Sequence, residues 1–172
     1  KMIKKIQHMK DLSDRLLAYS VHSVEEKYIP AGYVPLHSGL YDELSDMCSY
    51  LAEQGLAVKE NLRWEEGDVF IYGEYLTRIL DNISSNILKY ADVQALILVW
   101  DEYYADEMCI TFENVCGQKN SGMDSYNIGI RNVKMMMEEM GGKCEVVQDR
   151  ERFRICLRFR YKKSNRKTEN SF

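Results

Sequence analysis

The sequence predicts an α/β fold, a two-layer sandwich in which helices cover one face of a mixed sheet, preceded by a long helix. Apolar residues recur at helical spacing along residues 2–28 and 40–54, whereas from Ala57 onward short stretches alternate in the manner of strands. Late in the chain the strand-like stretches come in pairs joined by short turns, as antiparallel neighbours do. Helices interspersed with antiparallel pairs favour a single sheet that is covered on one side.

The bulk composition fits one domain with a packed core. The chain has 172 residues, of which 45% are hydrophobic and 29% are charged. Its formal net charge of −4 argues against nucleic acid as the main partner. No apolar run approaches the roughly 20 residues that span a bilayer. The five cysteines are odd in number and widely spaced, which fits a reducing cytoplasmic setting better than a disulfide framework or a zinc site.

The first thirty residues are expected to form one amphipathic helix, whose long apolar stripe suits a bundle or a dimer seam. Pro30 and Gly32 would end this helix. Residues 31–39, which include Pro35, are expected to be a linker. Because Lys1 already lies within the helical pattern, we expect the chain to be a fragment of a longer protein.

Residues 40–162 are expected to form the main domain, followed by a polar, disordered tail over residues 163–172. The predicted helices cover 40–54, 73–90 and 129–140. The predicted strands cover 57–64, 69–71, 94–101, 108–113, 143–148 and 152–161. Residues 115–128, rich in Gly, Ser, Asn and Asp, are expected to be a mobile loop.

The helix over residues 73–90 has the most informative polar face. Asn82 and Asn86 lie four residues apart and Lys89 follows after three more, so the three side chains share a face. The opposite face is a core stripe of Leu76, Ile79, Leu80, Ile83 and Ile87. Two amides and an ammonium in a row suit a hydrated metal ion and nucleotide phosphates. The alternative is a helix with an ordinary polar outer face.

This helix resembles the N-box of the sensor histidine kinases, a branch of the GHKL superfamily whose ATP-binding domains have the Bergerat fold. The matching positions are Arg78, Asn82, Asn86, Lys89 and Tyr90, and Ile87 replaces the usual alanine. The resemblance implies that Asn86 coordinates Mg²⁺ and that Asn82 contacts phosphate or a metal-bound water. It further implies that Lys89 meets the phosphates of ATP and that Tyr90 lines the nucleotide pocket. Mg²⁺ prefers oxygen ligands and keeps several waters, so an Asn carbonyl beside ATP phosphates suits it.

A second element resembles the glycine box of the same family. Gly129 and Ile130 match the second half of Gly-x-Gly-Leu, and Asn127 stands where the first glycine usually does. The resemblance implies phosphate binding at the start of the following helix. Free backbone N–H groups and the positive end of the helix dipole favour an anion there.

A third element resembles the family's Asp-x-Gly-x-Gly box, whose Asp accepts a hydrogen bond from the adenine amino group. Two registers are possible after Phe112. One places Asn114 in the Asp position, and the other places Glu113 there with Gly117 as the final glycine. We favour Asn114, because its side-chain carbonyl can accept the same hydrogen bond. No phenylalanine box lies in residues 115–128, so the ATP lid is expected to be short.

The resemblance also bears on the reaction. GHKL proteins that hydrolyse ATP usually carry Glu four residues before the metal-binding Asn, and this chain carries Asn82 there. An amide cannot take a proton near neutral pH, so transfer of the γ-phosphoryl group is favoured over hydrolysis. The chain is therefore expected to be the catalytic domain of a sensor histidine kinase in a two-component system. Such an enzyme phosphorylates a histidine for relay to a response regulator.

The leading helix resembles the second helix of the dimerisation and phosphotransfer hairpin, which implies a homodimer through this helix in the full-length protein. His8 lacks the acidic residue that usually follows the acceptor, so we expect the acceptor histidine outside this chain. Membrane spans are expected upstream, with this chain as a cytoplasmic portion. Two alternatives remain: a nucleotide-poor scaffold that dimerises or docks a partner, and an anti-sigma-type serine kinase, which Asn82 and the leading helix disfavour.

Overall fold

The computed structural model describes residues 31–117, 123–149 and 151–164, with the side chains of residues 123–128 excepted. The helices of this part are η1 (His37–Tyr41, a π-helix), α2 (Asp42–Glu53), α3 (Gly73–Tyr90) and α4 (Met123–Glu139). The strands are β1 (Gly32–Pro35), β2 (Ala57–Asn61), β3 (Gly67–Ile71), β4 (Leu96–Tyr103), β5 (Glu107–Val115), β6 (Lys143–Gln148) and β7 (Arg152–Lys163).

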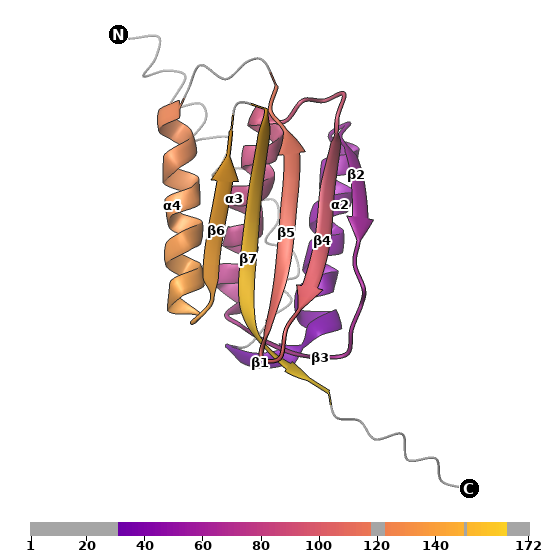
Figure 1. Ribbon diagram of the computed structural model, residues 1–172, viewed down its shortest axis with the longest axis vertical. Helices are drawn as coiled ribbons and strands as arrows, with labels where there is room; N and C mark the ends of the chain where they lie inside the picture. Colours follow the sequence, from indigo (N-terminus) through magenta and orange to yellow (C-terminus); the bar gives the residue numbers. More distant parts are fainter. Residues whose placement is uncertain (1–30, 118–122, 150, 165–172) are drawn as a thin grey trace, which may run out of the picture.

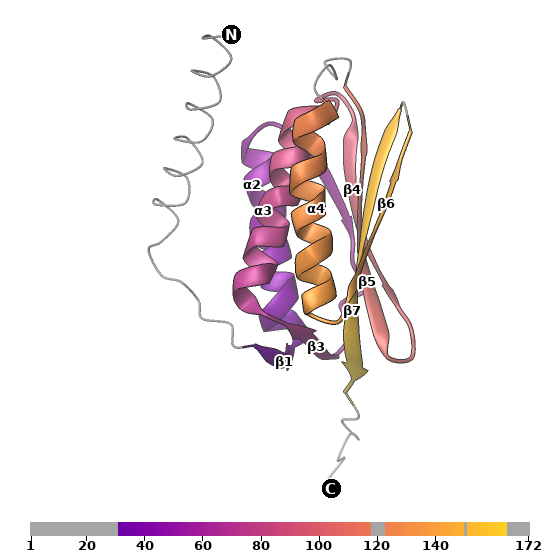
Figure 2. The same ribbon diagram turned by 90° about the vertical axis from the view of Figure 1, so that its left-hand side faces the viewer.

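The described strands form one mixed sheet, and the helices lie on one of its faces (Figures 1 and 2). The strand order is β1-β3-β7-β5-β4-β2, and β6 pairs with β7 off this path. The neighbours β4 and β5 are antiparallel, as are β6 and β7, whereas β2 runs parallel to β4. The predicted two-layer α/β sandwich and its late antiparallel pairs are therefore confirmed.

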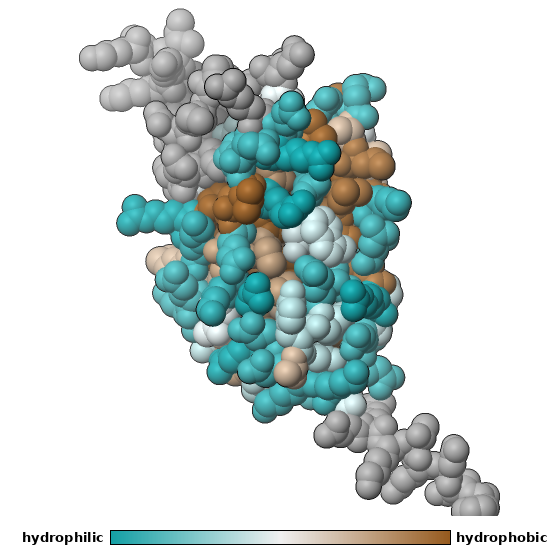
Figure 3. Space-filling view, in the orientation of Figure 1, coloured by the Kyte–Doolittle hydropathy of each residue, from teal (hydrophilic) through white to brown (hydrophobic). Residues whose placement is uncertain are grey.

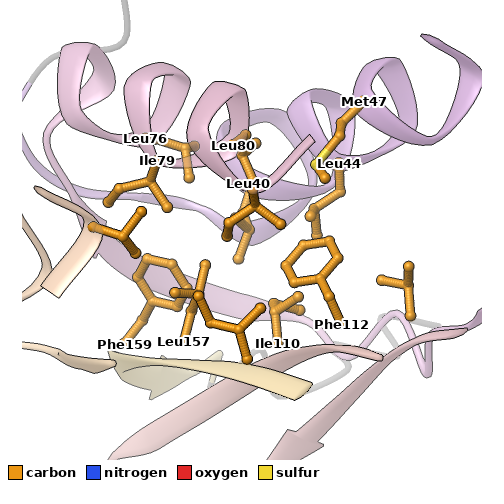
Figure 4. Packing of buried hydrophobic residues seen from close by; sticks show 14 of the residues in the cluster. Leu40, Leu44, Met47, Leu76, Ile79, Leu80, Ile110, Phe112, Leu157 and Phe159 are labelled. Carbon is orange, nitrogen blue, oxygen red and sulfur yellow. The ribbon is translucent and has the colours of Figure 1, made fainter. Parts of the chain in front are cut away.

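The core lies between the helices and the inner face of the sheet (Figure 4). Each member of the predicted stripe on α3 is buried, and Leu76, Ile79 and Ile83 are fully enclosed. From the sheet, Ile110, Phe112, Leu157 and Phe159 pack toward these helices. Burying one such side chain contributes about 1.5–3 kcal/mol relative to leaving it in water. This packing fixes the rotation of α3 and therefore the direction of its polar side chains.

The linker predicted for residues 31–39 is wrong. Strand β1 pairs antiparallel with β3, and η1 runs directly into α2. Val34 and Leu36 are buried in the core, so this segment is part of the sandwich. Pro35 is tolerated because β1 is an edge strand, where one face of the backbone has no ladder partner. The helix predicted for residues 1–30 and nearly all of the tail predicted for 163–172 lie outside the described residues.

Helix α4 begins at Met123, not at Gly129 as predicted, so the second half of the expected loop is helical. Gly129 lies inside the helix, where glycine costs about 1 kcal/mol relative to alanine. The apolar stripe of α4 offsets this cost, because Ile130, Val133 and Met137 pack into the core. The predicted helix is confirmed from Gly129 onward, and its predicted start is wrong.

Candidate functional site

Helices α3 and α4 bring two of the predicted motifs into contact. Gly129 on α4 lies against the amides of Asn82 and Asn86 on α3. A Cβ built on Gly129 would lie 3.2 Å from Asn82 Oδ1 and 3.6 Å from Asn86 Nδ2. The first distance is tighter than an ordinary van der Waals contact, so the absence of a side chain at 129 allows the helices this approach. The packing thus joins the predicted N-box and the predicted glycine box, which are far apart in the sequence.

Asn86 is buried, with 7% of its surface exposed, and its Nδ2 has no hydrogen-bond partner among the described residues. The alternative reading of an ordinary polar outer face therefore does not hold at Asn86. An unpaired buried donor costs roughly 1–3 kcal/mol, which makes such a group a candidate for ligand contact. A carboxamide also carries a carbonyl oxygen, the ligand type that Mg²⁺ prefers. The residue therefore fits a role beside a hydrated cation and phosphate.

Asn82 is half-buried, and its Nδ2 donates to the backbone oxygen of Arg78 at 2.7 Å. This hydrogen bond occupies the amino group and leaves Oδ1 facing Gly129. Lys89 is exposed in the last turn of α3, and Tyr90 is partly buried. A cation in the last turn of a helix is favoured by the helix dipole. The polar side chains of the predicted N-box from Asn82 to Tyr90 thus run along α3 from beneath α4 to the end of the helix.

The end of β5 separates the two registers considered for the adenine box. Asn114 is buried at 3% exposure on the face of the sheet that carries Phe112, and its Nδ2 donates to the oxygen of Val115 at 3.1 Å. Glu113 points to the opposite face, where it forms ion pairs with Arg152 at 3.1 Å and Arg154 at 2.5 Å. On this geometry Asn114, not Glu113, lies on the helix side of the sheet.

The segment after β5 runs beside the C-terminal end of α3. The backbone N–H of Gly117 donates to the oxygen of Tyr90 at 2.8 Å, and that of Asp92 donates to Val115 at 2.8 Å. A Cβ on Gly117 would lie 3.3 Å from the oxygen of Ala91, which is another close approach of backbone to backbone. The end of the N-box helix and the end of the adenine-box strand are therefore adjacent.

The predicted role of Gly129 and Ile130 at a helix start does not match the structure. Only the first four N–H groups of an α-helix lack an internal partner. Since α4 begins at Met123, the N–H groups of Gly129 and Ile130 fall beyond that turn, and Ile130 is buried in the core. In this conformation neither residue presents a free N–H group to phosphate.

A second buried polar cluster was not predicted from the sequence. Asp101 on β4 is 3% exposed and accepts hydrogen bonds from the N–H of Arg63 at 2.9 Å and the hydroxyl of Tyr103 at 2.8 Å. The hydroxyl of Tyr41, from η1, donates to the same carboxylate. Burial is the largest cause that raises the pKa of both tyrosines. The register places this cluster at the other end of β4 from the Asn114 side, where it joins η1 to the sheet.

No three His, Cys, Asp or Glu side chains of the described part come together as a metal-binding group. Within the same residues, no helix has the length and apolar character needed to cross a bilayer.

The sandwich of one mixed sheet covered by helices is the fold of the histidine kinase catalytic domains. Solved structures share this fold. They include the catalytic domain of histidine kinase ThkA (TM-score 0.60, 10% identity, 74% of this chain and 95% of that chain). The cytoplasmic segment of histidine kinase QseC is a second example (TM-score 0.54, 15% identity, 88% of this chain and 92% of that chain).

Sequence comparison gives a relative of the same class. The chain is 28% identical over 155 residues to the sensor histidine kinase YrkQ of Bacillus subtilis (strain 168). The match covers 90% of this chain and 36% of that protein, so the chain spans about a third of the length of its relative. No family model matches the chain. The chain is thus a homologue of a sensor histidine kinase with the fold of a histidine kinase catalytic domain.

Proposed function

We propose that this chain is the ATP-binding catalytic domain of a sensor histidine kinase. It transfers the γ-phosphoryl group of ATP to a histidine outside the chain, for relay to a response regulator. The observation that carries the proposal is the meeting of Asn82 and Asn86 with Gly129, at which the buried Asn86 amide keeps an unpaired donor. The homology to YrkQ supports it, as does the similar fold of ShkA, which was solved in complex with AMPPNP.

Each polar side chain of the candidate site has its own proposed contact with Mg-ATP. Asn86 is the proposed protein ligand of Mg²⁺, whose positive charge neutralises the phosphates when it is bound. Asn82 orients a phosphate or a metal-bound water through Oδ1. Lys89 adds a cation near the phosphates, Tyr90 lines the pocket, and Asn114 accepts from the adenine amino group. Phosphoryl transfer depends mainly on positioning and charge, so this set suffices without a strong base.

Phosphate binding by backbone N–H groups would require the first turns of α4 to open. In the present conformation α4 lies over Asn86, and the N–H groups of Gly129 and Ile130 lie inside the helix. This closed arrangement favours one second candidate, a scaffold domain that binds little nucleotide and acts by docking or dimerising. We place kinase activity first, because a scaffold has no use for an unpaired amide between two helices.

The further partners are also proposals. The full-length protein would dimerise through the N-terminal helix, contact a response regulator, and carry membrane spans upstream of a cytoplasmic catalytic portion. The greater length of YrkQ and the description of the QseC structure as a cytoplasmic segment support this arrangement.

Calorimetric titration with a non-hydrolysable ATP analogue tests the proposal. The wild-type chain should bind only with Mg²⁺ present, and Asn86→Ala should abolish that binding. Asn61→Ala is the matched control, because it removes an exposed amide from the edge strand β2. No heat from the wild type at high micromolar nucleotide would favour the scaffold.

Radiolabelled ATP tests the transfer step. The chain alone should remain unlabelled, and addition of the upstream acceptor hairpin should yield acid-labile label on that hairpin. Label on His8 of the isolated chain would contradict the proposed position of the acceptor.

A further inference from the structure

The open face of the sheet carries a cationic and apolar surface that the proposed nucleotide site does not use. The helices pack on the other face (Figure 2). Figure 3 looks onto the open face, where brown hydrophobic side chains lie on either side of teal hydrophilic ones in the upper half of the view. Side chains alternate between faces along a strand, so the strand register identifies the residues that share this face.

One row of residues across the sheet forms the centre of this surface. Leu98 on β4 lies opposite Glu113 on β5, which lies opposite Arg154 on β7. Beyond Arg154 the row continues to Val147 on β6, and beyond Leu98 it continues to Lys59 on β2. Apolar and charged side chains therefore alternate along the row from β2 to β6.

The apolar side chains of this surface are open to water. Leu96, two residues before Leu98 on the same face, is 52% exposed, and Val147 is 65% exposed. Trp100, two residues after Leu98, is partly exposed, and the guanidinium of Arg154 lies over its ring at 5.6 Å from the centroid. Apolar area in water costs about 25 cal/mol per Å², which a partner that covers these side chains would recover.

One carboxylate holds two guanidinium groups side by side. Arg154 Nε donates to Glu113 Oε2 at 2.7 Å, and Arg152 Nη1 donates to Glu113 Oε1 at 3.1 Å. The Glu113 side chain is 9% exposed, whereas those of Arg152 and Arg154 are 62% and 50% exposed. A guanidinium has five N–H donors, and Glu113 accepts from only some of them. The remaining donors are preorganised to bind a further carboxylate.

The charge balance of this surface is positive. Lys59, Arg152 and Arg154 bring three positive charges, against the single negative charge of Glu113. Glu113 is already engaged by both arginines. The carboxylates of a partner are therefore attracted to this surface, and positive charges are repelled.

Neighbouring carboxylates already have contacts of their own. Glu145 on β6 lies 3.7 Å from Arg158. Asp149, in the turn between β6 and β7, accepts from the backbone N–H groups of Glu151 and Arg152 at 2.8 Å each. Glu151 is exposed in the same turn, so an acidic partner is expected to lie over the strands and not over the turn.

The width of the surface fits one helix. Leu98 and Val147 lie on strands three positions apart in the order β4-β5-β7-β6, so they are separated by about 14 Å at the usual strand spacing. That distance corresponds to roughly ten residues of α-helix. Apolar side chains at the two ends of such a segment reach Leu98 and Val147, and carboxylates between them reach Arg152 and Arg154.

We propose that the open face of the sheet around Leu98, Arg154 and Val147 docks an acidic amphipathic helix of a partner protein. Carboxylates of this helix bind the guanidinium groups of Arg152 and Arg154, and its apolar residues cover the exposed leucine and valine side chains. The surface is separate from the proposed nucleotide site, which lies on the helix side of the sheet, so the two proposals can fail independently.

NMR titration of the full chain with two synthetic helical peptides tests the proposal. The first peptide carries leucine at positions i and i+11 of one helix face, with glutamate at i+4 and i+7 between them. The second carries lysine in place of both glutamates. The acidic peptide should shift amide resonances at Leu98, Arg154 and Val147, with an affinity that falls as salt is added. The lysine peptide should bind roughly tenfold more weakly or not at all, because it meets like charge.

Two substitutions separate the charged contact from the apolar one. Arg154→Ala should weaken binding of the acidic peptide by roughly five- to tenfold, and Val147→Ser by roughly two- to fivefold. Val147→Ser alters an exposed side chain, so it keeps the proposal testable if Arg154→Ala, which leaves Glu113 with one partner, fails to fold. Lys162→Ala is the matched control, because Lys162 lies at the other end of β7 over the ring of Tyr33.

The proposal is overturned if the acidic peptide causes no shifts at high micromolar concentration, or if the lysine peptide binds as tightly. Unchanged affinity in both Arg154→Ala and Val147→Ser would overturn it as well, as would amide shifts confined to the helices. Sedimentation of the free chain tests the other occupant. A dimer that Val147→Ser dissociates would show that a second copy covers this face, which would also contradict the proposal.

Discussion

At the scale of single residues, Asn86 shows how burial changes the meaning of a polar side chain. On the outside of a helix its amide would be satisfied by water, and its removal would cost nothing. Beneath α4 the same amide is enclosed at 7% exposure with Nδ2 unpaired. A group that weakens the unliganded domain is retained most readily where a ligand uses it.

Substitutions of Asn86 should therefore affect stability and binding differently. Asn86→Ala should leave the free energy of unfolding within about 1 kcal/mol of wild type, because no hydrogen bond of Nδ2 is lost. Asn86→Asp should destabilise the domain by about 2 kcal/mol or more, since it buries an unpaired carboxylate. Mg²⁺ should recover part of that loss by binding the new oxygen ligand. Urea unfolding with and without Mg²⁺ measures these differences, and an Ala variant less stable than the Asp variant would contradict them.

At the scale of elements, the packing of α3 against α4 encloses the candidate site. The contact depends on Gly129, whose missing side chain lets the backbone of α4 approach Asn82 and Asn86. At the end of this helix pair away from Gly129, the hydroxyl of Tyr75 on α3 donates to Glu139 on α4. A change at Gly129 should therefore alter the proposed nucleotide site while leaving the far end of the helix pair in place.

A double-mutant cycle tests this contact. Gly129→Ala gains about 1 kcal/mol of helix propensity but places a Cβ 3.2 Å from Asn82 Oδ1. We expect the crowding to cancel the gain, so the single variant should have near-wild-type stability. Adding Asn82→Ala removes the crowded amide, and the double variant should be more stable than the sum of the two single changes. Additive free energies of unfolding would show that the two residues do not touch in solution.

At the scale of the whole molecule, the Asp101 cluster joins parts of the chain that lie far apart. Tyr41 comes from η1, Arg63 from the segment after β2, and Asp101 and Tyr103 from β4. The cluster fixes the start of the domain to the sheet at the end away from Asn114. It makes the first helical turns part of the sandwich, although the sequence there suggested a linker.

Removing one donor from this cluster should be costly. Tyr41→Phe should lower the free energy of unfolding by roughly 1.5–3 kcal/mol, the value of a hydrogen bond to a charged group. Tyr50→Phe is the matched control, because Tyr50 is 40% exposed. Equal midpoints for the two variants in urea would contradict a structural role for the cluster.

The free energy of unfolding should also depend on alkaline pH through Tyr41. The folded state raises the pKa of Tyr41 above the ordinary value of 10.0, chiefly by burial. A raised pKa contributes stability that is complete below pH 10 and is lost as the pH rises above it. Between pH 9.5 and 11, the wild-type chain should lose more stability than Tyr41→Phe. Parallel curves of unfolding free energy against pH for the two chains would show that Tyr41 does not contribute to the loss of stability at alkaline pH.

The sequence alone was enough for those features that depend on neighbours along the chain. The bounds of α3 were predicted correctly because its five apolar positions repeat over several turns. The antiparallel pairs at β4–β5 and β6–β7 were predicted because their turns are short. Asn114 was preferred over Glu113 from residue chemistry, and the strand register places Asn114 on the helix side.

Other features followed from contacts between distant segments. Strand β1 forms because it pairs with β3. Gly32 and Pro35 in this segment did not indicate that pairing. Helix α4 continues through Gly129, where glycine is unfavourable, because Ile130, Val133 and Met137 hold its apolar face in the core. The burial of Asn86 and the Asp101 cluster each require segments more than 35 residues apart to meet.

The sequence by itself determined the α/β class, the core-facing stripes and the set of polar residues proposed to bind nucleotide, because periodicity and residue chemistry are local properties. The tertiary structure decided which of those polar residues are enclosed, which face the same space, and that α4 closes over Asn86. Burial and mutual distance depend on how helices and strands pack, and packing is settled by the whole core at once.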